Sequence, residues 1–121
     1  MNKPMMAAAV LSAATFGLHV LGGGRDVHTP IQASDLDVSL RAISAVLWHF
    51  VSLVLALQTG AFWALSQRAN PAMGWFLIGL EGGTAALFLF YGATLLGTIW
   101  MMPQWTIFLA LAALGLWGQK R

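Results

Sequence analysis

Residues 73–96 form an apolar run long enough to cross a lipid bilayer, and this run contains a single acidic residue, Glu81. About 20 apolar residues span the hydrocarbon core as an α-helix. An ionisable side chain at that depth costs at least ~2.5 kcal/mol on insertion scales, so it is rarely found there without a partner or a function. The run therefore predicts a membrane-spanning helix and makes Glu81 the first candidate for a functional residue.

The composition agrees with a membrane protein. Of the 121 residues, 59% are hydrophobic and only 8% are charged, whereas soluble domains carry about 25% charged residues. Because so few charges cannot cover a globular surface in water, we expect most of the outer surface to face lipid. The chain has no cysteine, which excludes disulfides, thiolate metal sites and cysteine nucleophiles. The net charge of +2 is carried by few residues, so nucleic-acid binding is not expected.

Four apolar segments predict an all-α fold, a polytopic membrane protein in which one domain of residues 1–121 forms a four-transmembrane-helix bundle. The expected spans are residues 4–21, 42–62, 73–96 and 104–117, with a periplasmic loop at about residues 22–38. The glycines at 22–24 favour the end of the first helix, and Pro30 disfavours an early restart. The fourth span is short, so it needs local thinning of the bilayer or side chains that reach the interface.

The N-terminal apolar run also resembles a signal peptide, because Lys3 precedes it. Its cleavage site is poor, and the apolar residues continue as far as Leu21. We therefore expect this run to be retained as the first span.

The distribution of basic residues predicts the orientation. One end of the expected bundle carries Lys3, Arg68, Lys120 and Arg121, and the other carries Arg25 and Arg41 beside three aspartates. Because lysine and arginine accumulate on the cytoplasmic side of membrane proteins, both termini and the loop around Arg68 are expected in the cytoplasm. The expected location is the inner membrane of a bacterium, with lipid as the main partner.

Small residues spaced four apart predict helix–helix contacts, because they let two backbones approach closely. The pattern places Gly17, Gly60, Gly79 and Gly83 at such positions. Contacts within the bundle are the favoured interpretation. Dimerisation through Gly79 and Gly83, or assembly into a larger membrane complex, is the alternative.

Polar residues at membrane depth are expected at two levels of the bundle. With a rise of about 1.5 Å per residue, Ser12, Gln58 and Glu81 fall at similar heights in the cytoplasmic half. Two hypotheses for Glu81 follow. In one, a protonated Glu81 bonds Gln58 or Ser12 and holds the helices together. In the other, Glu81 exchanges a proton or cation for a substrate in a small transporter.

His19 and His49 belong to the outer level, on the first and second spans. Two histidines on facing helices are able to ligate a haem or a metal ion, and His28 is a candidate third ligand. Their spacing has no local metal-site pattern, so the alternative is that each histidine bonds a neighbouring helix or the glycine-rich segment. We expect His19 and His49 to face each other, and no cofactor is the favoured interpretation.

Motifs of known catalytic sites are missing: the sequence has no G-x-S-x-G, no H-E-x-x-H and no P-loop. We therefore do not expect an enzyme.

His19, the glycines at 22–24, Pro30 and the pair Trp48-His49 together make an H…GGG…P…S-x-L…WH pattern over the first half of the chain. This pattern resembles a family of small four-helix bacterial inner-membrane proteins of unknown function. The resemblance implies a fold and a location, and no reaction.

Three functional hypotheses remain open. The favoured one is a non-enzymatic accessory or structural membrane protein with a polar bundle interior. The second is a proton- or cation-coupled transporter that uses Glu81, and the third is a haem- or metal-binding redox subunit that uses His19 and His49.

Overall fold

The computed structural model describes residues 1–121, and all of its regular elements are helices. In chain order the elements are α1 (Lys3–Gly17), the π-helix η1 (Leu18–His28), α2 (Thr29–Gln32), α3 (Val38–Gln67), α4 (Pro71–Leu95) and α5 (Trp105–Gln119). The expected all-α fold is confirmed.

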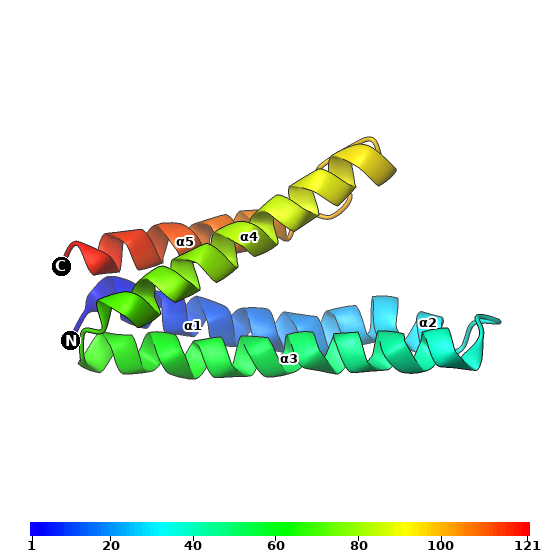
Figure 1. The fold of residues 1–121 in the computed structure, drawn as a ribbon, viewed down its shortest axis with the longest axis horizontal. Coiled ribbons are helices and arrows are strands. Elements are labelled where there is room, and N and C mark those ends of the chain that lie inside the picture. Colours follow the sequence, from blue (N-terminus) through cyan, green and yellow to red (C-terminus); the bar gives the residue numbers. More distant parts are fainter.

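The helices form two antiparallel hairpins. The first pairs the continuous segment α1–η1–α2 with α3, and the second pairs α4 with α5, as Figure 1 shows. α1 also packs against α5, which joins the hairpins at the end where both termini lie. At the other end α4 diverges from α3, so the hairpins are splayed there.

Three helical segments are long and apolar enough to cross a membrane: Lys3–Gln32, Val38–Gln67 and Pro71–Leu95. The first two have 30 residues each, about 45 Å of helix, which exceeds the hydrocarbon thickness of about 30 Å. α5 has 15 residues, or about 22 Å of helix, so it is shorter than the core of a typical bilayer.

The prediction that the first helix ends at residues 22–24 is wrong, and most of the expected loop at residues 22–38 is helical. The chain stays helical from Lys3 to Gln32, so only residues 33–37 connect the first hairpin. Glycine permits a left-handed conformation but does not require one, and the only glycine with a positive φ is Gly97, at +68° after α4. Of the three glycines, Gly23 packs against Trp48 of α3.

Side chains that accept a hydrogen bond from the first turn define where α3 and α4 begin. Asn70 accepts a bond from the amide of Met73 at 3.1 Å, with Pro71 in the first turn. Asp37 accepts a bond from the amide of Ser39 at 2.8 Å and caps α3. The hydroxyl and the amide of Ser39 lower the pKa of the Asp37 carboxyl, because both bonds stabilise its charged form.

Polar bonds tie the ends of the helices together. Beside the termini, the Asn2 side chain donates to the carbonyl of Gly118 at 2.8 Å, and its backbone amide donates to Ser66 at 2.7 Å. At the far end Gln32 and Arg41 exchange side-chain-to-backbone bonds of 3.0 and 3.1 Å. These bonds fix α1 to α5 and to α3 at one end, and α2 to α3 at the other.

The prediction that Gly17, Gly60, Gly79 and Gly83 pack against other helices of the bundle is wrong. A Cβ atom added at any of them would meet no atom within 4 Å. Spacing shows which residues share a helix face, but not which face is covered. The close approaches are instead at Gly23, Gly74, Gly92, Gly115 and Gly118, where an added Cβ would lie 3.0 Å or less from a neighbouring atom. Dimerisation through Gly79 and Gly83 stays a prediction.

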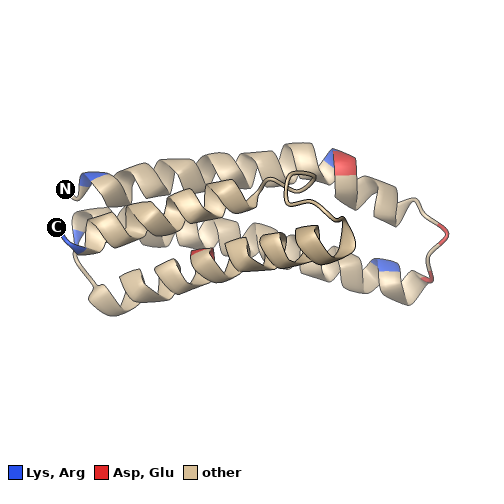
Figure 2. Ribbon diagram, turned by 90° about the horizontal axis from the view of Figure 1, so that it is seen from above, with Lys and Arg blue, Asp and Glu red and all other residues tan.

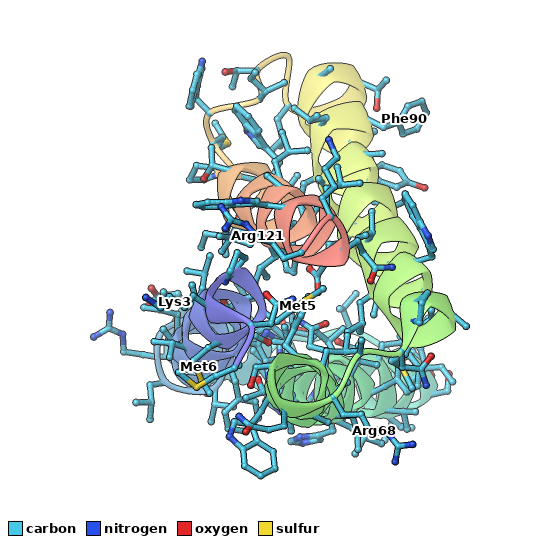
Figure 3. All side chains as sticks on the ribbon, turned by 90° about the vertical axis from the view of Figure 1, so that its left-hand side faces the viewer. Lys3, Met5, Met6, Arg68, Phe90 and Arg121 are labelled. Carbon is cyan, nitrogen blue, oxygen red and sulfur yellow. The ribbon has the colours of Figure 1, made fainter.

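Apolar side chains cover most of the surface. Only 21 of the 121 residues are buried, and the core is a narrow cluster that includes Met5, Phe62 and Leu111. Figure 3, viewed from the end with the termini, shows Met5 pointing between the helices while Phe90 points outward. Such a surface is suited to lipid rather than to water, and Figure 2 shows that charged residues gather mainly at the two ends.

Candidate functional site

Glu81 lies on the interior face of α4. Its side chain is 1% exposed, and Gly74, Leu77 and Ala85 on the same face are buried with it. The expectation that Glu81 points into the bundle rather than toward lipid is confirmed. Ten residues separate it from the start of α4 at Pro71, which places it about 15 Å along the helix and therefore deep in a bilayer.

Ser12 and Gln58 are buried at a similar height, and they bond each other. The Gln58 amide donates to Ser12 Oγ over 3.1 Å, and Thr59 Oγ1 lies 2.9 Å from the same oxygen. Thr59 Oγ1 also bonds the carbonyl of Leu55 at 2.8 Å. A hydroxyl carries one proton, so Thr59 donates to Leu55 and Ser12 donates to Thr59. We call these three side chains, Ser12, Gln58 and Thr59, the α1–α3 polar link.

The expected hydrogen bond from Glu81 to Gln58 or Ser12 is not formed. Both carboxyl oxygens of Glu81 are buried and have no hydrogen-bond partner. Ser12 and Gln58 bond each other instead, between α1 and α3. Buried polar groups without partners are rare in folded proteins, and each one needs an explanation.

A second group of polar side chains gathers around Trp48, in the half of the first hairpin that lies farther from the termini. The His19 ring stacks on the Trp48 indole with centroids 4.0 Å apart, and His28 stacks on it at 5.5 Å. His19 Nε2 lies 3.3 Å from the Trp48 carbonyl oxygen. Because a carbonyl only accepts, His19 is the donor and carries its proton on Nε2.

The π-helix explains how His19 and His28 reach the same indole. In an α-helix of 3.6 residues per turn, two residues nine apart point in opposite directions. The wider turn of a π-helix, with its i→i+5 bonds and roughly 4.4 residues per turn, brings them back to one face. η1 spans Leu18–His28 and includes both histidines. Since two turns of helix separate them, their rings lie on opposite faces of Trp48.

Gly23 occupies the turn between the two histidines and leaves room for Trp48. A Cβ atom at Gly23 would lie 2.8 Å from Cη2 of the indole, closer than side-chain contacts allow. The neighbours Gly22 and Gly24 have nothing within 4 Å. Gly23 is therefore the glycine of the triplet that the structure uses for packing. We call His19, Gly23, His28 and Trp48 the histidine–tryptophan stack.

The expectation that His19 and His49 face each other is wrong. His19 contacts Trp48, whereas His49 meets the edge of His28 with centroids 5.2 Å apart. The two histidines therefore contact different members of the stack. No group of three or more His, Cys, Asp or Glu side chains is arranged to hold a metal ion, so His19, His28 and His49 do not form a ready three-ligand site.

Comparison with protein-family models, with curated proteins and with solved structures finds no match for this chain. Two features of the fold offer chemistry: the unpartnered Glu81 and the histidine–tryptophan stack.

Sequence reasoning missed the roles of Trp48 and Gly23. Trp48 is one of six tryptophans, and the sequence alone does not show that two histidines stack on it. A signal for the stack does exist in the spacing of His19, Gly23 and His28, four and five residues apart, which fits the wide turn of a π-helix. The same spacing has no meaning in an α-helix, which is the usual expectation.

Proposed function

We propose that this chain is a small multi-pass protein of a bacterial inner membrane that uses Glu81 as the proton- or cation-binding residue of a coupled transporter. The proposal includes four membrane spans and places both termini in the cytoplasm. The observation that carries it is the burial of both Glu81 carboxyl oxygens without a hydrogen-bond partner.

The argument for a functional Glu81 is energetic. A charged carboxylate without a partner costs several kcal/mol in the interior, so the resting protein holds Glu81 with a proton or an equivalent cation. A purely structural carboxyl is expected to bond its neighbours, whereas neither carboxyl oxygen of Glu81 has a hydrogen-bond partner. An acid that is costly to bury and contributes no bond to the fold fits a site that exchanges its proton.

The divergence of the two hairpins allows the conformational change that a transport cycle needs. α4 carries Glu81 and diverges from α3 beyond the middle of the molecule. Exchange of a proton requires access from each side of the membrane in turn. A change in the angle between α4 and α3 is the motion that would open the interior around Glu81.

The first prediction tests this role with Glu81→Gln. Glutamine keeps the size and the hydrogen-bonding capacity but cannot release a proton, so we expect a folded, normally abundant protein without proton-coupled uptake. Proteoliposomes with an imposed pH gradient and an internal pH dye measure the coupled proton flux across a panel of substrates. Ser66→Ala is the matched control, because Ser66 is also buried but already bonds the carbonyl of Trp63 at 2.6 Å. Unaltered proton flux in the Gln variant would eliminate Glu81 as the coupling residue.

The second prediction concerns orientation. Figure 1 shows both termini and the connection between α3 and α4, which carries Arg68, at the same end of the molecule. The preference of basic residues for the cytoplasm assigns this end to the inner side. Reporter fusions after Arg68 and after Arg121 should give cytoplasmic signals, and one placed between residues 33 and 37 should give a periplasmic signal. A periplasmic signal at Arg121 would mean that α5 does not span the membrane or that the orientation is reversed.

A specific observation favours a second function, that of an accessory or structural subunit. Of the most apolar window of α3, only 6% is buried within the chain, which leaves a long face free for lipid or for a larger membrane complex. This function predicts that Glu81→Gln changes nothing beyond stability. The same variant therefore separates the two functions.

A further inference from the structure

An open groove of about 510 Å³ lies beside the histidine–tryptophan stack, between η1 and the outer part of α3. Its polar lining comes from Arg25, His28, Thr29, His49 and Ser52, and its apolar part from Val20, Leu21 and Trp48. This volume is within the range of sites that hold small organic molecules, about 300–1,000 Å³. The groove is separate from Glu81, which does not line it.

The groove lies where the hydrocarbon of a bilayer meets its polar surface. Trp48 and His49 are 19 and 18 residues from the end of α3 at Gln67, or about 28 Å along the helix, against a hydrocarbon thickness of about 30 Å. Val20 and Leu21 are 40% and 78% exposed on the lipid-facing side. A molecule that enters from the membrane can therefore place an apolar tail along these two residues and its head group in the polar part.

The polar part of the groove offers hydrogen-bond donors. His28 Nδ1 is buried without a partner, and a buried N–H without an acceptor is the costlier state for such a nitrogen. The proton therefore sits on Nε2, which makes no hydrogen bond within the chain and is not among the buried atoms. His49 is exposed in the groove and has no hydrogen bond within the chain, so it supplies a second donor.

The groove does not suit an anionic head group. Arg25, its only cation of fixed charge, already bonds Asp26 at 2.8 Å. A neutral acceptor needs only the imidazole N–H groups of His28 and His49 and meets no competing carboxylate among the residues that line the groove. The neutral group that accepts two such bonds and is carried by membrane-soluble molecules is the carbonyl oxygen.

We propose that this groove binds a carbonyl-bearing, membrane-soluble molecule, with His28 and His49 donating to the carbonyl oxygen and Val20 and Leu21 contacting the apolar tail. The shared chemistry has two sources, the head group of a quinone and the ester carbonyls of a phospholipid. This inference is independent of Glu81 and of the proposed transport function.

The test is a binding titration of the whole protein in detergent micelles, in which calorimetry measures the heat of binding. One arm adds a short-chain alkylated benzoquinone, and the other adds a phospholipid with short acyl chains. We expect saturable binding with one site per chain in at least one arm, weakened about tenfold by His28→Ala or by His49→Ala, as expected when one hydrogen bond to a ligand is lost. Thr94→Ala is the control, because Thr94 is exposed on α4 and bonds only the Phe90 carbonyl.

The outcomes separate the sources and decide the proposal. Binding of the quinone that phospholipid does not displace assigns the groove to a quinone, and the opposite result assigns it to lipid. His49 is an exposed residue in the middle of a long helix, so His49→Ala keeps the test valid if His28→Ala does not fold. The proposal is overturned if neither ligand binds saturably, or if the folded His49 variant binds as the unmodified protein does.

Discussion

Replacing Trp48 by alanine is expected to lower the free energy of unfolding by about 3 kcal/mol, the lower end of the range for removing a packed tryptophan. The indole contacts His19 at 4.0 Å and His28 at 5.5 Å, and both contacts depend on its ring. Loss of the indole leaves a void beside Gly23, because the three atoms nearest to a Cβ placed on Gly23 all belong to Trp48. Two imidazoles then lose their stacking partner at once.

The measurement is thermal unfolding in detergent followed by far-ultraviolet circular dichroism. Trp63→Ala provides a matched control on α3, since the Trp63 side chain is 57% exposed and takes part in no aromatic pair. We expect a shift of less than about 1 kcal/mol for that variant. Equal shifts for the two variants would show that the histidine–tryptophan stack contributes nothing to stability.

The helical class and the apolar segments were predictable, because hydrophobicity over about 20 residues is a strong signal with one physical cause. The start of α4 was predictable from Asn70 and Pro71, since capping by an asparagine followed by proline depends on local chemistry alone. The continuation of the first helix through residues 22–24 was not. Glycine accommodates both helical and left-handed backbone, so the three glycines alone do not determine whether the helix continues.

In the candidate sites, too, some features were predictable from the sequence and others were not. That Glu81 is buried follows from the cost of exposing a carboxyl to lipid, and the sequence was sufficient for this. That it lacks a hydrogen-bond partner depends on how side chains of helices distant in sequence are oriented, just as the bonds from Ser12 to Gln58 and Thr59 do. The grouping of His19 with His28 depends on a π-helix, which is rare and has no strong sequence signal. Height along a helix was predictable, whereas the direction of each side chain around it was not.

The glycines at 22–24 give the most selective prediction, because three identical residues in one helix have different surroundings. Gly23→Ala is expected to destabilise the protein by about 1–3 kcal/mol, the usual cost of overpacking a fitted site. The new Cβ would lie 2.8 Å from the Trp48 indole. The rings of His19 and His28 hold the indole on both faces, so it cannot yield without breaking a stack.

Gly22→Ala is the control, and we expect it to stabilise the protein instead of destabilising it. Nothing lies within 4 Å of a Cβ at Gly22, and alanine in a helix interior is more favourable than glycine by about 0.5–1 kcal/mol. The two variants add the same methyl group one residue apart, so their difference isolates the contact with Trp48 from helix propensity. Thermal unfolding of both in the same detergent measures that difference, and tryptophan emission reports a displaced indole. If Gly23→Ala stabilises the protein as much as Gly22→Ala does, residues 18–28 do not hold Trp48 between the two histidines, and the groove beside the stack has a different shape.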